Sequence, residues 1–414
     1  MSRIEKGNNS ASLKQHNRTI ILSALARAEK MSRIDIARAT GLSKGGVTTI
    51  ISELLDLGLV TEIGTADSRG GKKPILLEIN SEGCFSIVVD WTRTECSVAR
   101  VDASGGISSL TVKSYTEADT PDTIISFIIS VVQSLLGTRD SFLGICVVAP
   151  GPIDRKNGVI LNPPNFHGWK NIDITGSLGD FFHCTVFLEN VANAHGIAEK
   201  NIGLGRNCAN FIHIIVDEGI GAAVIENFNL HLGRDGFGNE LGHISINLDG
   251  PVCSCGNKGC LELYASLPAL MRRLKTAIEI GIPSGFFDNC TSVAAVTWED
   301  VVSGFKANDP LCCNLMKKEA EYLGSAIVTA INLFEPQVII LGSKITKAGI
   351  NLIRLLEEEL RNILFSRAYH EVTIHLSEIE NASLSGGGFV VWEHFIKGNL
   401  GAYEAVLGCE GYGL

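Results

Sequence analysis

The chain of 414 residues has no run of about 18 apolar residues, and it contains only 11 prolines, 4 tryptophans and 4 methionines. The missing apolar run excludes a membrane-spanning helix, so we expect no membrane insertion. Residues 1–17 are polar and lack the apolar stretch of a secretory signal, which indicates a cytoplasmic protein. The scarcity of proline beside 44 glycines excludes a proline-rich disordered chain and indicates many tight turns between regular elements.

Charge is sparse and unevenly distributed along the chain. Only 19% of the residues are charged and 45% are apolar, which is enough to build sizeable cores in the two or three domains expected at this length. Residues 1–80 carry 12 lysines and arginines against 8 aspartates and glutamates, a net charge of +4, so residues 81–414 carry −14. A basic head on an acidic body suggests that the head meets a polyanion. Chance segregation is the alternative, because an excess of four charges is small.

The head contains the signals of three consecutive helices. Apolar residues fall on roughly one face over residues 13–28. Ser32 then begins a second short helix, with Asp35 at capping-box spacing, and Gly41 is placed to end that helix in the left-handed conformation. Ser43 opens a third helix, whose apolar positions recur at intervals of three and four residues. Two short helices around a glycine-containing turn predict a helix-turn-helix motif.

The third helix and the segment after it predict a winged DNA-binding domain. In a helix-turn-helix the second helix enters the major groove and its N-terminal residues reach the base edges. Two strand-like runs, 59–63 and 75–79, then flank a basic loop, and such a wing is suited to phosphate or minor-groove contact. The candidate DNA-binding residues are Ser43, Lys44, Thr48, Thr49, Arg69, Lys72 and Lys73.

A small three-helix bundle that binds a protein, or nothing, is the alternative interpretation of the head, because polar helix faces are usually only solvated. Gly45 and Gly46 also depart from a good helix, since each costs roughly 1 kcal/mol against alanine. These glycines either let the backbone approach DNA closely or leave the first turn frayed.

From Phe85 onward the pattern alternates between strands and helices. We expect strands at 87–90, 97–101, 110–113, 143–148, 185–188, 211–216, 221–225 and 337–341, and helices at 121–136, 192–200 and 319–333. This alternation predicts an α/β fold with mixed sheets. Binding sites are then expected in the loops at strand ends or between lobes.

The spacing His243-x9-Cys253-x-Cys255-x4-Cys260 predicts a metal centre. Three thiolates and one imidazole complete a tetrahedral zinc site, and glycines inside the loop let it turn back on itself. Because four protein ligands leave no position for water, the zinc would be structural. The alternative is a set of ordinary buried cysteines. The other nine of the 12 cysteines are scattered and are expected to be reduced thiols.

The run Gly238-Asn239-Glu240-Leu241-Gly242-His243, followed by residues 253–262, resembles the signature of the ROK family of repressors, open reading frames and sugar kinases. The wing and residues 149–154, 162–169, 335–342 and 386–388 are also similar to family segments. The resemblance covers nearly the whole chain. The order of head and body resembles the repressor branch, which includes xylose and N-acetylglucosamine repressors.

The resemblance implies an α/β protein in which an N-terminal winged helix-turn-helix precedes a two-lobed, actin-like ATPase domain of the sugar-kinase kind. The implied domains are the DNA-binding head at 1–80, a small lobe at 81–190 plus 388–414, and a large lobe with the zinc site at 191–387. It also implies a sugar held by Asn190, Glu240, His243 and Glu262. Carboxylates accept hydrogen bonds from sugar hydroxyls, and an amide both donates and accepts. Ordinary surface carboxylates are the alternative for the two glutamates.

Three departures from the kinase members of the family bear on activity. Kinases carry Asn-Asp-Ala-Asn where this chain has Val191 in the second position, and valine cannot act as the general base, a loss that typically costs about 10²–10⁴ in rate. The first phosphate loop, usually Asp-x-Gly-Gly-Thr, has Thr92 and Arg93 in place of both glycines. The second, usually Gly-Thr-Gly-x-Gly, begins Asp217-Glu218, whose charge would repel a triphosphate.

These residues predict a sugar-responsive, DNA-binding transcriptional repressor of carbohydrate metabolism genes, without catalytic residues. As a homodimer or homotetramer it would bind double-stranded operator DNA, with a small sugar as effector and structural zinc as the only cofactor. An ATP-dependent sugar kinase with an accessory DNA-binding head is the second hypothesis. A regulator controlled by a protein partner instead of a sugar is the third.

Overall fold

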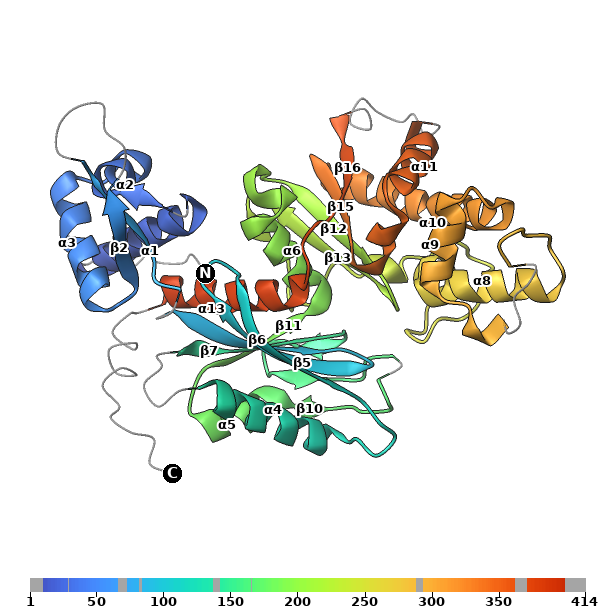
Figure 1. The fold of residues 1–414 in the computed structure, drawn as a ribbon, viewed down its shortest axis with the longest axis horizontal. Helices are drawn as coiled ribbons and strands as arrows, with labels where there is room; N and C mark the ends of the chain where they lie inside the picture. Colours follow the sequence, from blue (N-terminus) through green and yellow to red (C-terminus); the bar gives the residue numbers. More distant parts are fainter. Residues whose placement is uncertain are drawn as a thin grey trace, which may run out of the picture. The chain divides into compact units, whose positions relative to one another are not determined.

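The computed structural model describes residues 10–28, 30–65, 73–81, 84–136, 142–164, 166–287, 293–361 and 371–398 (Figure 1). The chain forms two compact units, one made of residues 1–190 with 383–414 and the other of residues 191–382. It therefore passes between the units twice, after Asn190 and after Ala382. In the described part of the chain, no helix has the length and apolarity that crossing a bilayer requires.

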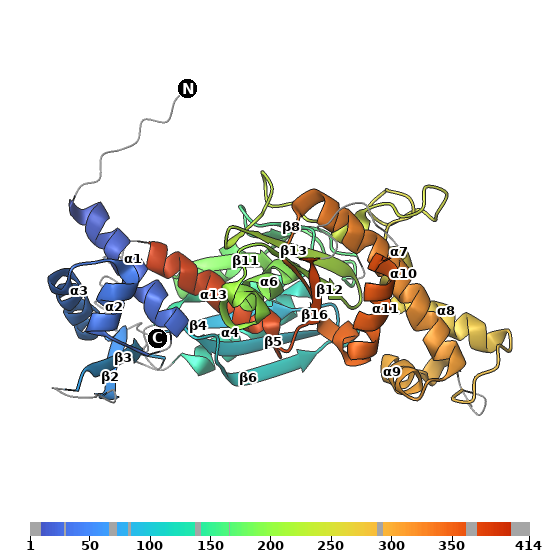
Figure 2. The ribbon, with the colours of Figure 1, turned by 90° about the horizontal axis from the view of Figure 1, so that it is seen from above.

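The first unit begins with a head of three helices and a small sheet, coloured blue in Figures 1 and 2. Its elements are α1 (Ser10–Ala28), β1 (Met31–Ser32), α2 (Arg33–Thr40), α3 (Lys44–Asp56), β2 (Val60–Thr65) and β3 (Ile75–Ile79). The strands form an antiparallel sheet in the order β1-β3-β2. This is the predicted series of helices followed by a hairpin, with β1 as an additional strand that the sequence did not indicate.

The predicted caps of α2 and α3 are confirmed. Ser32 Oγ accepts a hydrogen bond from the Asp35 amide at 3.2 Å, and Ser43 Oγ accepts one from the Gly46 amide at 3.1 Å. Gly41 ends α2 with a φ of +71°, a conformation that glycine adopts at no steric cost. A cap of this kind stabilises a helix by about 1 kcal/mol, so the turn between α2 and α3 is fixed locally.

The head has its own apolar core. Its buried side chains are Ile21, Leu22, Leu25, Ile36, Val47, Ile50, Ile51, Leu54, Leu59 and Leu77. The predicted apolar face of α1 is wrong at its start, because the Leu13 side chain is 52% exposed. Polar contacts hold this part of α1 instead: Lys14 Nζ and Arg18 Nη2 pair with the Glu53 carboxylate of α3 at 2.6 and 2.7 Å.

The rest of the first unit is built on a five-stranded sheet in the order β11-β7-β4-β5-β6. Its elements are β4 (Phe85–Trp91), β5 (Glu95–Asp102), β6 (Ile107–Ser114), α4 (Pro121–Leu135), β7 (Phe142–Ala149), α5 (Ile174–Phe182), β11 (Val186–Asn190) and α13 (Ala382–Lys397). Strands β11, β7 and β4 are parallel, and β5 and β6 extend the sheet antiparallel. A small sheet of β8 (Ile153–Asp154), β9 (Val159–Ile160) and β10 (Ile172–Asp173) completes the unit.

Helices cover both faces of this sheet (Figure 1). On one face, alternate strand residues such as Ile87 and Ile145 share an apolar core with α4 and α5. On the other face α13 lies so close that a Cβ on Gly387 would be 2.5 Å from Val88, and one on Gly388 would be 2.5 Å from Val101. The glycines at 386–388 therefore serve close packing of a helix on a sheet.

The far end of α13 contacts the head. The carbonyl oxygen of Ile396, in its last turn, accepts hydrogen bonds from Thr19 Oγ1 at 2.5 Å and from Gln15 Nε2 at 3.2 Å, both on α1. Gln15 also donates to the carbonyl oxygen of Gly398. The last carbonyls of a helix have no partner within the helix, so the head satisfies acceptors that would otherwise need water.

The second unit is built on a five-stranded mixed sheet in the order β14-β13-β12-β15-β16. Its elements are α6 (Val191–Ile202), η1 (Leu204–Asn207), β12 (Phe211–Val216), β13 (Ile220–Glu226), β14 (Asn229–Leu230), η2 (Leu241–His243), α7 (Glu262–Ala265), α8 (Leu267–Glu279), η3 (Val293–Ala295), α9 (Trp298–Lys306), α10 (Pro310–Phe334), β15 (Val338–Gly342), η4 (Ser343–Ala348), α11 (Ile350–Arg361) and β16 (Thr373–Leu376). The α/β class and the mixed sheets agree with the prediction.

The helix predicted at 319–333 is longer than expected. Helix α10 begins at Pro310, where the Asp309 carboxylate accepts a hydrogen bond from the Cys312 amide at 3.0 Å. Aspartate before proline is a strong start signal, which the apolar pattern alone did not reveal.

Candidate functional sites

The predicted DNA-contacting face lies on α3. Lys44, Thr48 and Thr49 are exposed in its first two turns, and Ser43 caps its start. On the opposite side, Val47 and Ile50 are buried in the head core, so the polar side faces outward. No partner of the Lys44 ammonium is found among the described residues, and its charge is available to a phosphate or a base.

The wing is described only at its edges. Lys73 is exposed just before β3. Arg69 and Lys72 lie outside the described residues. The contribution of these two side chains to the basic wing stays a prediction.

The predicted metal ligands lie together. The ligand atoms of His243, Cys253, Cys255 and Cys260 are all within 4.8 Å of one another. The Cys255 and Cys260 sulfurs are 3.6 Å apart, and the Cys253 sulfur lies 3.7 Å from His243 Nδ1. A tetrahedral zinc ion with Zn–S bonds of about 2.3 Å would place its sulfurs about 3.7 Å apart, so the donor set and its spacing fit zinc.

The loop that carries these ligands turns on two glycines. Gly256 has a φ of +91° and Gly259 a φ of +63°, and a Cβ on Gly259 would collide with the Asn247 carbonyl oxygen. Asn257 Nδ2 donates to the His243 carbonyl oxygen at 3.1 Å, which ties the two ends of the loop. Burial raises the pKa of the Cys253 thiol, but hydrogen bonds from the Cys255 amide and the neighbouring ligand groups outweigh it and lower that pKa to about 7. A lowered thiol pKa favours metal binding, which needs thiolates, whereas burial and hydrogen bonds with Cys255 and Cys253 raise the pKa of Cys260 to about 12.

Three of the four residues predicted to hold a sugar lie in the second unit, around this loop. Glu240 directly precedes η2, His243 is its last residue, and Glu262 begins α7. Partial burial raises the pKa of Glu240, while His243 lowers it and the Glu262 carboxylate raises it. Because the Nδ1 atom of His243 faces Cys253, its Nε2 atom is left for a ligand. Asn190, the fourth residue, ends β11 in the first unit.

In the first predicted phosphate loop, at residues 92–95, a side chain of the loop accepts hydrogen bonds from the loop's own amides. Thr92 Oγ1 accepts hydrogen bonds from the amides of Thr94 at 3.3 Å and Glu95 at 3.1 Å. These are amides that an open glycine loop would offer to phosphate. Arg93 is also engaged, since its Nε donates to the Pro164 carbonyl oxygen at 2.8 Å and its own carbonyl oxygen lies 2.8 Å from His167 Nε2. Thr92 and Arg93 therefore tie this loop to its surroundings.

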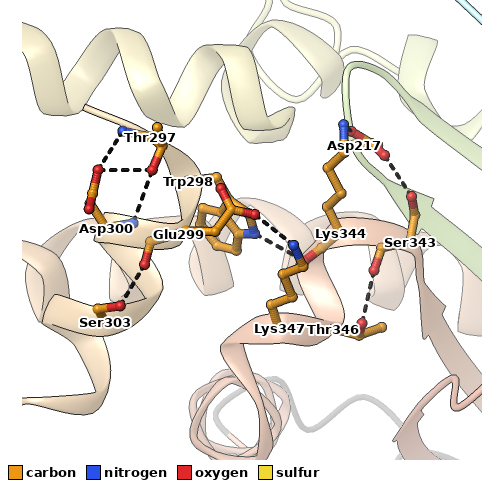
Figure 3. Close-up of polar contacts among 10 residues, drawn as sticks. All are labelled: Asp217, Thr297, Trp298, Glu299, Asp300, Ser303, Ser343, Lys344, Thr346 and Lys347. Carbon is orange, nitrogen blue, oxygen red and sulfur yellow. Dashed lines mark hydrogen bonds and ion pairs between the residues drawn. The ribbon is translucent and has the colours of Figure 1, made fainter. Parts of the chain in front are cut away.

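The second altered loop is closed by an ion pair (Figure 3). Strands β12 and β15 are parallel, so the residues that follow them lie at the same edge of the sheet, where α/β proteins bind ligands. At that edge the Asp217 carboxylate accepts a hydrogen bond from Ser343 Oγ at 2.7 Å and pairs with Lys344 Nζ at 2.9 Å. Burial lowers the pKa of Lys344, but the pairing with Asp217 outweighs it and the pKa is raised.

Helix α9 fixes the segment that supplies Lys344 (Figure 3). Trp298 Nε1 donates to the Lys344 carbonyl oxygen at 3.0 Å, and Lys347 Nζ pairs with the Glu299 carboxylate at 2.6 Å. Sequence reasoning missed Ser343 and Lys344. The φ of +68° at Ser343, which is uncommon for a residue other than glycine, marks this position in the structure, but the sequence does not reveal it.

Glu262 joins the metal loop to the second altered loop. Its Oε2 accepts a hydrogen bond from the Ile220 amide at 3.0 Å. The carboxylate expected to face a sugar therefore also holds a backbone amide beside Asp217.

Comparison with known proteins is consistent with this arrangement. Residues 86–394 match the model of the ROK family, and residues 15–70 match the MarR family, whose members carry DNA-binding domains of the winged type. The chain belongs to the ROK family.

Its relatives include repressors. A xylose repressor from Bacillus spizizenii is 30% identical over 389 residues, which are 93% of this chain and 97% of the repressor. The crystal structure of a ROK family transcriptional regulator, a homologue of the Escherichia coli MLC protein, has a TM-score of 0.80 and 26% identity and covers 95% of this chain and 99% of its own. A ROK family glucokinase from Streptomyces griseus, solved with glucose and AMPPNP, has the fold of the body, with a TM-score of 0.65, 24% identity and 74% and 98% coverage.

Proposed function

We propose that this chain is a sugar-responsive transcriptional repressor of carbohydrate genes, which binds operator DNA through its head and a sugar through its body, and which has no kinase activity. The observation that carries the proposal is the presence, in one chain, of a capped helix with an exposed Lys44-Thr48-Thr49 face and of a ROK body. A xylose repressor is similar over nearly the whole of both chains. Operator DNA as the partner puts the protein in the cytoplasm.

The sugar would be bound in the second unit by Glu240, His243 and Glu262, and the part of Asn190, which lies in the first unit, stays a prediction from the family resemblance. The carboxylates accept hydrogen bonds from hydroxyl groups, the Asn190 amide donates and accepts, and His243 offers Nε2. Structural zinc on Cys253, Cys255, Cys260 and Nδ1 of His243 would hold this imidazole and the neighbouring Glu262 in position, as outer supports do in other metal sites. This zinc would have no coordination position for a reacting group, because its four protein ligands complete the tetrahedron.

The loss of kinase activity is supported at three places. Val191 offers no proton acceptor where kinases have a general base. The amides of the first loop are engaged by Thr92 Oγ1. In the second loop Asp217 places a carboxylate, neutralised by Lys344, where backbone would approach phosphate. The result is a body that binds a ligand without turning it over.

Regulation would require a dimer, or a pair of dimers, that presents two heads to two half-sites about one helical turn, or a multiple, apart. A sugar changes DNA affinity only if it binds the two states of the protein with different affinity.

The test is fluorescence anisotropy with the purified protein and labelled duplexes from upstream of its own gene. Binding should weaken as salt rises, and one sugar of a panel of pentoses, hexoses and N-acetyl sugars should change it. Lys44→Ala should lose DNA binding, and Glu240→Ala should lose only the sugar response. DNA binding that no sugar changes would favour control by a protein partner.

A coupled assay with ATP and the same panel tests the alternative of a sugar kinase. Turnover above about 1 s⁻¹, the low end of ordinary kinase rates, would overturn the loss of activity.

A further inference from the structure

The exposed face of α3 has an unusual composition for a DNA-reading surface. Gly45, Thr48, Thr49 and Ser52 are spaced at i, i+3, i+4 and i+7, so they share one face of the helix, and all four are exposed. Lys44 is the only charged residue beside them in the first two turns. Long side chains that read bases through paired hydrogen bonds, such as arginine, asparagine or glutamine, are absent from α3.

The hydroxyl groups on this face are already engaged. Thr48 Oγ1 donates to the Lys44 carbonyl oxygen at 2.8 Å, Thr49 Oγ1 to Gly45 at 3.1 Å, and Ser52 Oγ to Thr48 at 3.0 Å. A hydroxyl has one hydrogen to donate, and each of these is used within the helix. What Thr48 and Thr49 retain for a partner is a methyl group and an acceptor lone pair.

Gly45 has no packing reason to be glycine. A Cβ at this position would have no atom within 4 Å, whereas a Cβ on Gly46 would lie 3.1 Å from Ser43 Oγ. The φ of Gly45 is not in the left-handed region either, since it lies inside a regular helix. A glycine that weakens a helix without serving the fold indicates that a partner approaches the backbone there.

We infer that α3 recognises thymine, with the Thr48 and Thr49 methyl groups packing against the 5-methyl groups of thymine in the major groove and Gly45 leaving room for that approach. Thymine is the only DNA base that carries a methyl group in the major groove, and apolar contact with it is a known form of base readout. This inference rests on the proposed DNA-binding function and names the bases that the same face selects.

The inference is tested by removing one methyl at a time from each partner. In an operator duplex identified as above, each thymine is replaced in turn by deoxyuridine, which lacks only the 5-methyl group. At the contacted positions the Kd of the wild type should rise roughly fourfold, the equivalent of one buried methyl group. Thr48→Ser and Thr49→Ser, which keep the hydroxyl and lose the methyl, should raise it by a similar factor on the thymine duplex.

The decisive measurement combines the Thr48→Ser protein with the deoxyuridine duplexes. At a position that Thr48 contacts, Thr48→Ser should bind the thymine and deoxyuridine duplexes equally, because the partner methyl is gone. At all other positions, the loss of affinity caused by Thr48→Ser should add to the loss caused by deoxyuridine. Thr329→Ser is the matched control, since the Thr329 hydroxyl on α10 also donates to the carbonyl four residues earlier, at 3.0 Å, and lies outside the head.

Gly45→Ala tests the close approach separately. The head should melt at a higher temperature, because alanine is the better helix former and has open space around it, yet DNA affinity should fall at least tenfold. Unchanged affinity of Gly45→Ala would overturn the close approach, and indifference of the wild type to every deoxyuridine would overturn methyl readout. If no duplex binds at any salt concentration, the proposed function fails instead, so the two failures are distinguishable.

Discussion

Two loops in the second unit differ in what their side chains bind. The metal loop, residues 243–260, keeps glycines where a side chain would collide, and its thiols and imidazole converge on one point. The loop at 217–221 lies beside it, joined to it by Glu262, but there Asp217 is bound by Ser343 and Lys344 of the same unit. The side chains of the first loop have the geometry to bind a metal ion, whereas Asp217 in the second loop binds side chains of the same unit.

The largest effect is expected from breaking the metal loop. Cys255→Ser should lose the metal and destabilise the second unit by about 3 kcal/mol or more, a fraction of the roughly 10–16 kcal/mol with which structural zinc is bound. Metal content by mass spectrometry and unfolding by calorimetry measure both. Cys313→Ser, a half-buried thiol on α10 outside the cluster, should change neither. Full metal content in Cys255→Ser would contradict the four-ligand site.

The next largest loss of stability is expected from breaking the ion pair that holds α7, the helix directly after the metal loop. Arg273 pairs with the fully buried carboxylate of Glu319 at 2.6 Å and also donates to the Tyr264 carbonyl oxygen on α7. Burial raises the pKa of Glu319 to about 8 even though Arg273 lowers it, so Arg273→Met should cost up to about 3–5 kcal/mol in urea unfolding only above about pH 8, where the carboxylate is ionised and would be left unpaired. The double variant Arg273→Met/Glu319→Leu should recover most of that loss. A single-variant cost below 1 kcal/mol in that pH range would show that Glu319 is protonated or solvated without its partner.

The first altered loop offers a pH test in the other unit. Burial raises the pKa of Asp90 from 3.8 to about 6, although a hydrogen bond with Ser383 lowers it. The folded state therefore keeps a proton that the unfolded state loses above about pH 4. The stability of the wild type relative to Asp90→Asn should fall as the pH rises from about 4 to 6, by up to roughly 3 kcal/mol, and stay level above that range. Melting temperatures of both proteins from pH 4 to 7 measure this difference, and a rise would have the wrong sign.

The smallest changes in stability are expected from replacing Lys347 and Lys344, two lysines of η4 (Figure 3). Lys347 and Glu299 form an exposed pair, so Lys347→Met should change stability by less than about 0.5 kcal/mol. Lys344→Met should cost somewhat more, about 1 kcal/mol, because the largely buried Asp217 carboxylate loses its cation. Equal losses in chemical denaturation would mean that the pair at the second loop is as solvated as the exposed one.

The head and the metal loop were predicted well from the sequence because their signals are local. Caps such as Ser32 and Ser43 act within three residues, and the metal ligands lie within 18 positions of one another. What the sequence did not reveal depends on partners distant along the chain. Lys344 meets Asp217 only because β12 and β15 are neighbours in the sheet, and Arg93 meets Pro164 across 71 positions.

Helices α6 and α10 of the second unit were predicted, but α8, α9 and α11 were missed for a related reason. Helices α8, α9 and α11 carry one apolar side each, but their apolar residues acquire meaning only in the shared core with α10 and the sheet. The placement of Asn190 in one unit and of Glu240, His243 and Glu262 in the other likewise depends on where the chain passes between the units.

Helix α13 gives that passage a mechanical consequence. It begins where the chain returns to the first unit, its glycines lie against the sheet, and its last carbonyls hold α1 of the head. A straight helix of 16 residues is about 24 Å long, so a tilt of about 5° at one end displaces the other by about 2 Å. That is more than the slack of a hydrogen bond. A small tilt of α13 on its sheet would therefore break the hydrogen bonds that hold α1, so the position of the head in the first unit depends on the orientation of this one helix.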